Sequence, residues 1–245
     1  YVDDAVGSRP AYVVRIDEHS AAASTALRSR CPELSAATGF DPDRPLTADA
    51  HHAVRAAARG LLDPAARQAA QAAACRQALA NGIVAVHENG GPDIGGLDDF
   101  RALADLDPPL MIRRYWGEPV ADAEAATALL ASTGADALGG DLFIDGSLGS
   151  HTAWLREPYA DRPGTGVTYL DADRVRAHLL ACTAAGIQAG FHAIGDAAVT
   201  AVTDALVAVA DELGRDAVVR RAHRIEHAEM VTAEQAETLA GLGVV

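Results

Sequence analysis

Apolar and β-branched runs alternate with helix-like segments along most of the chain. Segments with strand character occupy residues 12–17, 83–88, 110–116, 142–145, 187–192 and 221–227, and another begins at Val244. Segments with helical periodicity lie between them, at residues 63–81, 122–133, 171–185, 196–213 and 232–242. Repeated helix–glycine–strand units are typical of a parallel sheet covered by helices. The pattern therefore predicts an α/β fold.

Two parallel architectures fit this order of elements, an open doubly wound sheet and a closed barrel. The glycine pairs at residues 90–91 and 95–96 lack the G-x-G-x-x-G spacing that a dinucleotide-binding open sheet would show. We therefore expect a (β/α)8 TIM-type barrel, incomplete in this chain, with the first strand and the C-terminal part missing. Residues 1–245 are interpreted as one barrel domain, the internal portion of a longer protein. The Pro- and Gly-rich stretch 156–166 is long for a connection and is expected to cover the site.

Charge and composition exclude several classes of partner and chemistry. The chain has 20 Lys and Arg residues against 34 acidic ones, a net charge of −14, and all the basic residues are arginines. Binding to nucleic acid needs a basic face, so it is not expected. The absence of lysine excludes Schiff-base chemistry and a carboxylated lysine as a metal bridge.

The chain contains no apolar stretch of about 18 residues, so we expect no membrane partner. Three widely spaced cysteines without a C-x-x-C pair favour a reducing, cytoplasmic location.

Histidine and aspartate recur where the predicted strands end, which is where parallel α/β folds place their active sites. His192 closes one predicted strand, and His223 and His227 lie on the next. Alternation along that strand puts His223, Ile225 and His227 on one face, expected to be the cavity face, with Arg224 and Glu226 behind. Such histidines can be metal ligands or hydrogen-bonded core residues, and their recurrence on neighbouring strands favours a metal. Three other histidines, in helical patterns, are expected at the surface: His51, His52 and His178.

Carboxylates also recur at the ends of the predicted strands. Asp141 and Asp145 are four residues apart on the predicted strand 142–145 and its approach, so they share a face. Either could bind a cation or act as a base, although Asp145-Gly146 also reads as a simple turn. Asp17 and His19 share a face in the same way and could line a pocket.

Four segments together resemble a known family: Arg15–Ser20 (RIDEHS), Phe143–Ala153 (FIDGSLGSHTA), His192–Asp196 (HAIGD) and Arg224–Ala228 (RIEHA). In this order and spacing they are similar to the amidohydrolase superfamily, specifically its YtcJ-like branch, amidohydrolase family 3. The resemblance runs through nearly the whole chain. It implies a metal-dependent hydrolase on a (β/α)8 barrel, usually with a small β-sandwich built from both chain ends.

The resemblance also implies a ligand set. His192 and His227 correspond to the family's two later metal-binding histidines, and Asp141 stands where the family has a lysine. Aspartate can ligate or bridge a metal but is shorter than a carboxylated lysine, so both one and two zinc ions remain open. The family's H-x-H pair and its final aspartate, the general base, are expected before residue 1 and after residue 245. The residues expected to bind substrate are His19, Asp145, His151 and His223.

The expected reaction is hydrolysis of a non-peptide C–N bond in a small amide, N-formyl or cyclic amide substrate by a metal-activated water. Two alternatives remain open. One is a catalytically impaired, ligand-binding barrel, which the departure at Asp141 favours. The other is a metal-free lyase or isomerase that uses His and Asp as acid and base. Barrels of this type often pair, so a homodimer is among the expectations.

Overall fold

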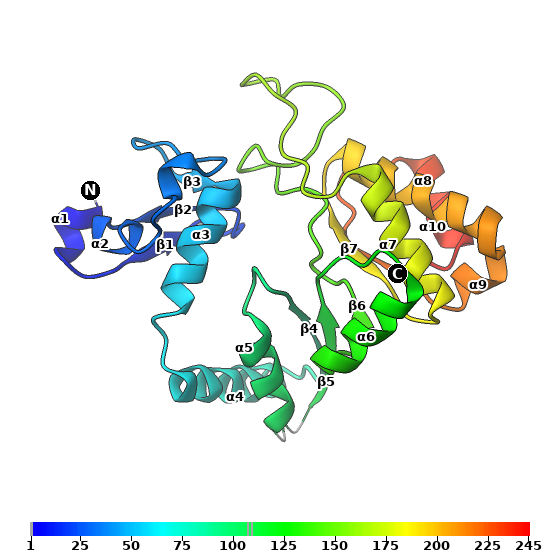
Figure 1. The fold of residues 1–245 in the computed structure, drawn as a ribbon, viewed down its shortest axis with the longest axis horizontal. Coiled ribbons are helices and arrows are strands. Elements are labelled where there is room, and N and C mark those ends of the chain that lie inside the picture. Colours follow the sequence, from blue (N-terminus) through cyan, green and yellow to red (C-terminus); the bar gives the residue numbers. More distant parts are fainter. Residues whose placement is uncertain (1, 107, 109) are drawn as a thin grey trace.

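The structure is a computed structural model that describes residues 2–106, 108 and 110–245 (Figure 1). Its strands are β1 (Tyr12–Val14), β2 (Ser20–Ala23), β3 (Leu46–Thr47), β4 (Ala85–Gly90), β5 (Met111–Trp116), β6 (Ala137–Leu138), β7 (Gly190–Ala193) and β8 (Arg224–His227). Its α-helices are α1 (Val2–Val6), α2 (Thr25–Arg28), α3 (Ala48–Arg59), α4 (Pro64–Ala80), α5 (Leu97–Ala102), α6 (Ala123–Thr133), α7 (Ala172–Ala184), α8 (Asp196–Leu213), α9 (Arg215–Val219) and α10 (Ala233–Gly241). Short 3₁₀ helices occur at Leu34–Ala36 and Leu103–Asp105.

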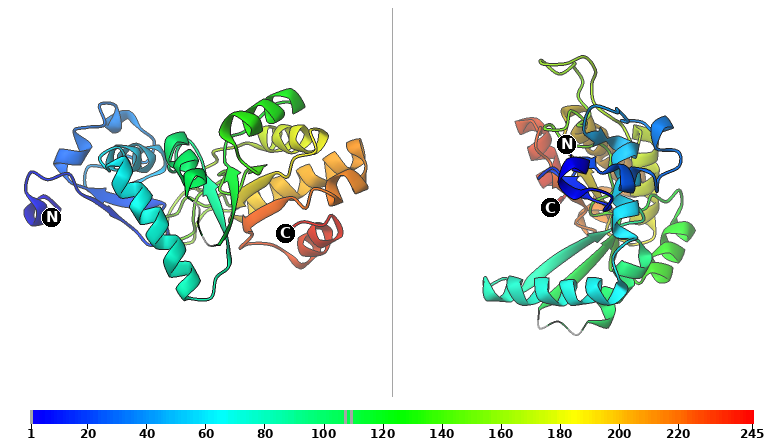
Figure 2. Two further views of the ribbon diagram at one scale, coloured as in Figure 1. Left: turned by 90° about the horizontal axis from the view of Figure 1, so that it is seen from below. Right: turned by 90° about the vertical axis from the view of Figure 1, so that its left-hand side faces the viewer.

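Residues 2–59, here called the N-terminal unit, form an antiparallel sheet of order β1-β2-β3 with α3 packed beside it. Its core is separate from that of the rest of the chain and consists of Leu27, Leu34, Leu46, Ala50 and Val54. Figure 1 shows the unit at one end of the long axis, and the left view of Figure 2 shows the same separation.

The strand predicted at residues 12–17 was expected in the parallel sheet, and this expectation is wrong. It forms β1, which pairs antiparallel with β2 through a tight reversal in which Arg15 and Ser20 are hydrogen-bonded. A parallel neighbour needs a crossover of a dozen or more residues, whereas only a few residues separate these strands.

Residues 85–245, here called the parallel unit, contain the predicted α/β arrangement. β4, β5 and β6 pair in parallel, as do β7 and β8. An isolated parallel bridge between Leu138 and Ala189 joins β6 to β7, so the five strands follow one another in chain order. Val245 continues beside β8, because its N–H donates to the His223 carbonyl and its carbonyl accepts from Ile225. The α/β class is therefore confirmed.

The strand predicted at residues 142–145 is only partly present: the regular pairing falls on β6, and residues 142–144 keep two backbone hydrogen bonds to His192 of β7. Gly139 and Gly140 have φ values of 132° and 68°, which end the extended conformation after Leu138. A Cβ atom at Gly139 would lie 2.2 Å from the Gly190 nitrogen, so only glycine fits this close approach. Beyond the glycines, Phe143 keeps a single bridge to His192 on β7. The break leaves Asp141 beside the end of β7.

The helices were predicted more accurately than the strands. The segments around residues 63–81, 122–133, 171–185, 196–213 and 232–242 form α4, α6, α7, α8 and α10. Aspartate side chains accept backbone N–H groups at the starts of three of them, Asp63, Asp122 and Asp171. The surface positions expected for His51 and His178 are wrong, since both are 0% exposed.

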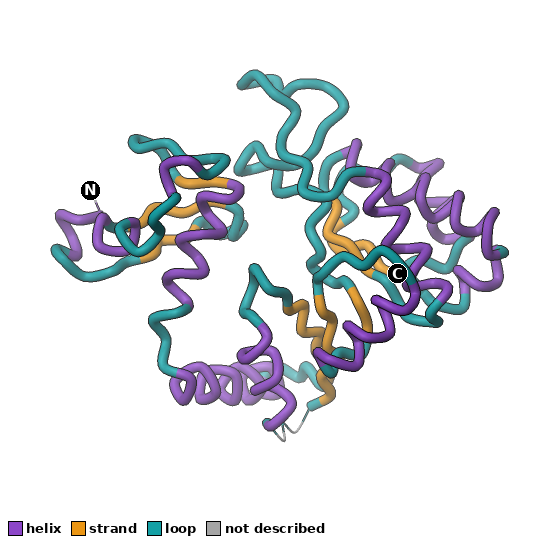
Figure 3. Tube along the Cα trace, in the orientation of Figure 1, coloured by secondary structure: helices purple, strands orange, loops and turns teal. Residues whose placement is uncertain are grey.

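The main core lies between the parallel strands and their helices. Phe191 of β7 and Ile225 of β8 pack there with residues of α7 and α8 such as Leu179 and Val199. Between β6 and α7 the chain runs without helix or strand, and Figure 3 shows this stretch, residues 139–171, extending past the strand ends. In the part of the chain that the structure describes, no helix combines the length and apolar character needed to cross a membrane.

Candidate metal centre and adjoining pocket

Three side chains from the parallel unit converge at the carboxyl ends of the strands. Asp141, His192 and His227 each place one potential ligand atom within 4.8 Å of the others. Nδ1 of His192 lies 3.1 Å from Oδ1 of Asp141, and Nε2 of His227 lies 3.9 Å from the same oxygen. His192 is 1% exposed, whereas 43% of the His227 side chain is exposed. The cluster therefore has a buried side and a side open to solvent.

His227 reaches the cluster because β8 ends at it. Ile225 packs into the helix-facing core, whereas the Arg224 guanidinium lies over the Tyr115 ring at 5.6 Å and pairs with Glu226. The predicted arrangement, with Ile225 on the cavity face and Arg224 and Glu226 behind, is therefore wrong. Strand alternation would send His227 to the side of Ile225. Its φ of 73° ends the extended conformation and lets the imidazole come to 4.6 Å, centroid to centroid, from that of His192.

The hydrogen bond at Nε2, the second ring nitrogen, fixes the tautomer of His192. Nε2 is 3.1 Å from the Gly146 carbonyl oxygen, which can only accept, so Nε2 carries the proton and donates. In a neutral imidazole, Nδ1 then turns its lone pair toward Asp141. Two lone pairs this close require a cation or a proton between them. A backbone carbonyl behind a histidine is the usual support of a metal ligand.

The charges at the cluster follow from burial and from the mutual contacts. Burial lowers the pKa of His192, but the hydrogen bond to Asp141 outweighs it, so that this pKa is raised. Burial raises the pKa of Asp141, yet the His192 bond and the neighbouring imidazoles bring it below its usual value. Burial, followed by repulsion from His192, lowers the pKa of His227. Near pH 7, Asp141 is thus charged and His227 neutral, which are the protonation states that bind a metal.

The donor set fits zinc. Imidazole nitrogens and carboxylate oxygens bind Zn²⁺ at about 2.0–2.2 Å in tetrahedral geometry, so that two ligand atoms are separated by roughly 3.3–3.6 Å. The separations of 3.1 and 3.9 Å to the Asp141 oxygen lie on either side of that value.

His19 of the N-terminal unit lies next to this cluster. Its ring is 5.1 Å from that of His192 and 5.8 Å from that of Phe143. Burial, and then repulsion from His192, lowers the pKa of His19 to about 4, so it is neutral near pH 7. Its backbone N–H donates to Asp17, whose other oxygen accepts from the Ser147 and Ser150 hydroxyls at 2.8 and 2.7 Å. Asp17 thus ties the turn that bears His19 to the loop after Asp145.

Asp145 is fully buried, and its carboxylate accepts backbone hydrogen bonds rather than facing the cavity. Its carboxylate accepts the N–H groups of Trp154, Ile194 and Gly195 at 2.7–3.0 Å. Burial raises the pKa of Asp145 even though these three bonds act in the opposite direction. The carboxylate joins the flanking loop to the turn after His192. Its expected contact with substrate stays a prediction.

The structure does not bring His223 and His151 to the cluster. His223 is 1% exposed, accepts from the Ala189 N–H at 2.9 Å and lies 3.0 Å from the Thr183 hydroxyl. Nε2 of His151 lies 2.8 Å from an Asp161 oxygen within the long loop. Both expected substrate roles stay predictions without a contact that supports them.

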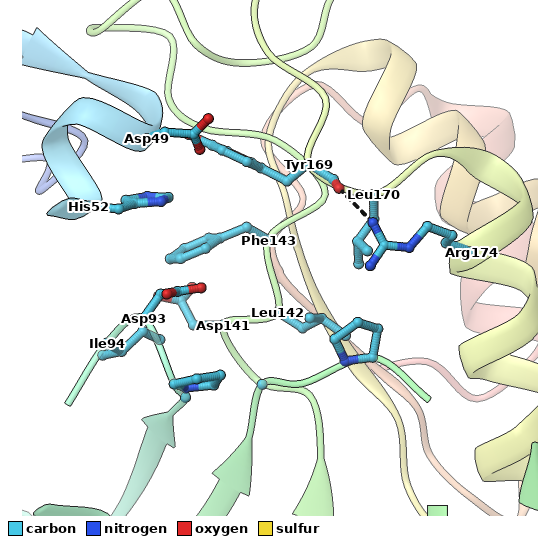
Figure 4. Close-up of a pocket in the computed structure, with 14 residues that line it drawn as sticks. Asp49, His52, Asp93, Ile94, Asp141, Leu142, Phe143, Tyr169, Leu170 and Arg174 are labelled. Atoms are coloured by element: carbon cyan, nitrogen blue, oxygen red, sulfur yellow. Dashed lines mark hydrogen bonds between the residues drawn. The ribbon is translucent and has the colours of Figure 1, made fainter. Parts of the chain in front are cut away.

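A pocket of about 250 Å³ adjoins the cluster on the side of Asp141 (Figure 4). It lies between α3, the ends of β4 and β5, and the loop around Phe143. Its lining residues are Asp49, His52, Gly91, Pro92, Asp93, Ile94, Gly117, Pro119, Asp141, Leu142, Phe143, Tyr169, Leu170 and Arg174. Sequence reasoning missed His52 and Tyr169. His52 lies in a helical pattern of alanines, and nothing local indicates that α3 packs against the site.

A parallel α/β sheet with a His–His–Asp cluster at its carboxyl edge defines an α/β protein with a candidate metal centre. The whole chain, residues 1–245, matches the model of the family described as "Amidohydrolase family". The chain belongs to this family, and the resemblance of its sequence motifs is confirmed.

Segments of the chain are similar to two curated proteins. Protein LONG AFTER FAR-RED 3 of Arabidopsis thaliana is 37% identical over 105 residues, 42% of this chain and 17% of that protein. Putative amidohydrolase YtcJ of Bacillus subtilis (strain 168) is 33% identical over 104 residues, 42% of this chain and 18% of that protein. The matched segments thus cover a minor part of each relative.

Two solved structures share the fold. One is an uncharacterized metal-dependent hydrolase from Pyrococcus horikoshii OT3, with a TM-score of 0.66 and 24% identity over 98% of this chain. The other, an uncharacterized metal-dependent hydrolase from Pyrococcus furiosus, has a TM-score of 0.65 and 24% identity over 99% of this chain. The match covers 48% and 51% of those chains, so this chain spans about half their length.

Proposed function

We propose that the protein is a metal-dependent amidohydrolase that cleaves a non-peptide C–N bond in a small amide, N-formyl or cyclic amide. Nδ1 of His192, Nε2 of His227 and a carboxylate oxygen of Asp141 hold the metal. The observation that carries the proposal is the convergence of these three donors within 4.8 Å at the carboxyl edge of a parallel sheet. Membership of the amidohydrolase family supports it.

Zinc is the proposed metal, as one ion or two. When bound, zinc would lower the pKa of a coordinated water toward about 7 and would polarise a carbonyl group. The chain's own groups hold this arrangement in place. The Gly146 carbonyl orients His192, and the three backbone bonds of Asp145 fix the turn after β7. His19, neutral and beside Phe143, is proposed to contact the substrate.

The proposal also covers the fold of the whole protein, its location and its oligomeric state. The five parallel strands in chain order support a (β/α)8 barrel in the whole protein. Three free thiols, on Cys31, Cys75 and Cys182, support a reducing, cytoplasmic location. A homodimer stays a prediction.

Metal analysis tests the proposal on the protein at its full natural length. Purified wild type should hold one or two zinc ions per chain by mass spectrometry. The His192→Ala, His227→Ala double variant should hold almost none. The control His87→Ala removes an exposed imidazole of β4 and should keep the wild-type content. Equal zinc in wild type and the double variant would contradict the proposed ligands.

Activity separates the proposal from its two alternatives. Hydrolysis of a panel of amides, N-formyl amides and cyclic amides should stop with a chelator and return with zinc. Turnover that persists in the chelator indicates the metal-free lyase or isomerase. Stoichiometric zinc without turnover of any panel member indicates the ligand-binding barrel.

A further inference from the structure

Three aromatic rings form one wall of the pocket beside Asp141. His52 comes from α3, and Phe143 and Tyr169 come from the two ends of the long loop. The His52 ring stacks on those of Phe143 and Tyr169 at centroid distances of 5.9 and 5.4 Å and interplanar angles of 20° and 30°. All three side chains are partly exposed, so the wall presents ring surface to the cavity.

Apolar residues also line the rest of the pocket. Pro92, Ile94 and Leu142 line them, together with the backbone of Gly91 and Gly117. In Figure 4, Phe143 lies between the level of Asp49 and that of Asp141, with Ile94 and Leu142 near its lower side. A flat apolar group in the pocket therefore meets both aromatic and aliphatic side chains.

The size of the cavity limits what it holds. Small-molecule sites commonly enclose about 300–1,000 Å³. A volume of about 250 Å³ lies just below that range, which suits one ring with a short substituent rather than a long chain.

Charged side chains also line the pocket. Asp49 and Asp93 lie on the same side as His52, and Arg174 lies on the opposite side (Figure 4). Arg55, 4% exposed, stands behind the wall and donates from Nη2 to the Asp93 carbonyl at 2.7 Å. Among the lining residues, three are acidic (Asp49, Asp93 and Asp141) and one, Arg174, is basic. The lining therefore disfavours an anionic ligand.

We propose that this pocket binds a neutral aryl or heteroaryl group of the substrate, stacked against Phe143 and His52. Phe143 also packs edge-on against His192 at 5.1 Å, so a ring on this wall lies next to the candidate metal centre. The position of the scissile bond beside that centre rests on the proposed function. Binding of the ring in the pocket does not depend on the proposed function.

Calorimetric titration of a matched pair of probes tests the inference on the protein at its full natural length. Benzamide and cyclohexanecarboxamide share the carboxamide and differ in ring flatness and π-system. Wild type should bind benzamide about three- to tenfold more tightly, the range expected for aromatic contacts. The preference should fall to near unity in Phe143→Leu and at least by half in His52→Leu. Phe40→Leu, a partly buried phenylalanine of the N-terminal core, is the matched control and should keep it.

The outcomes distinguish this inference from the proposed function, because the titrations are run with zinc and with a chelator. A benzamide preference in both states, lost in Phe143→Leu, supports the inference even if no amide is hydrolysed. Equal affinities for the two probes in wild type overturn it, even if zinc-dependent hydrolysis is found. A preference that survives in both Phe143→Leu and His52→Leu overturns it as well.

Discussion

The N-terminal unit and the parallel unit meet at the candidate metal centre but contribute different things to it. The three donors Asp141, His192 and His227 all belong to the parallel unit, where backbone hydrogen bonds set their positions. The N-terminal unit contributes His19, whose ring lies beside that of His192, and His52, whose ring stacks on that of Phe143. The difference indicates that one unit supplies the candidate metal ligands and the other lines the space beside them.

The largest expected effect tests this division directly. Asp141→Asn removes the charge shared by both imidazoles and should weaken zinc binding at least about 100-fold, since even outer partners of metal ligands contribute 10–100-fold. His19→Ala should leave zinc affinity within about threefold while lowering turnover. Competition with a chromophoric chelator measures both affinities. A comparable loss in the two variants would show that the N-terminal unit also binds the metal.

Asp145→Ala should destabilise the parallel unit strongly. It leaves the N–H groups of Trp154, Ile194 and Gly195 buried without an acceptor, at about 1–3 kcal/mol each, so the free energy of unfolding should fall by about 3 kcal/mol or more. Asp122→Ala is the control, because it removes an exposed helix cap and should cost about 1 kcal/mol. Urea unfolding measures both, and equal losses would contradict the role of Asp145.

Acid should destabilise the core of the parallel unit through His178. Burial lowers the pKa of this fully buried imidazole from 6.5 to about 4. Between these values the unfolded chain takes up a proton that the folded chain does not, so stability falls as the pH drops from about 6.5 to 4. The loss from this group should reach about 2 kcal/mol at pH 5.

His178→Gln keeps a group able to accept the Val120 N–H but does not titrate. Urea unfolding at pH 7 and pH 5 should therefore show a smaller pH-dependent loss in this variant, by about 2 kcal/mol. The same loss in wild type and variant would mean that His178 titrates normally in the folded protein.

The smallest expected effect concerns the contact between the units. Asp17→Asn weakens the bonds from the Ser147 and Ser150 hydroxyls and should cost about 1 kcal/mol of stability, without changing zinc affinity. Thermal unfolding and the chelator competition measure the two quantities. A loss of zinc as large as that in Asp141→Asn would show that the contact holds the metal ligands themselves.

Prediction from sequence succeeded where local signals agree with the tertiary structure. Helices α4 and α7 begin at capping aspartates and follow the expected ranges, and the predicted cluster of Asp141, His192 and His227 is the one that the structure brings together. Prediction from sequence failed where a break in the extended backbone decides which way a side chain points. The glycines before Asp141 and the positive φ of His227 override strand alternation, and no pattern of apolar residues shows either break.

By itself, the sequence determined the α/β class, the family and the three residues of the candidate cluster, because periodicity, capping and spaced motifs are local properties that folding preserves. Only the tertiary structure decided that residues 12–14 turn back into an antiparallel hairpin and that α3 brings His52 against Phe143. These arrangements depend on packing between segments far apart in the chain, where the burial of apolar and aromatic surface outweighs local preference.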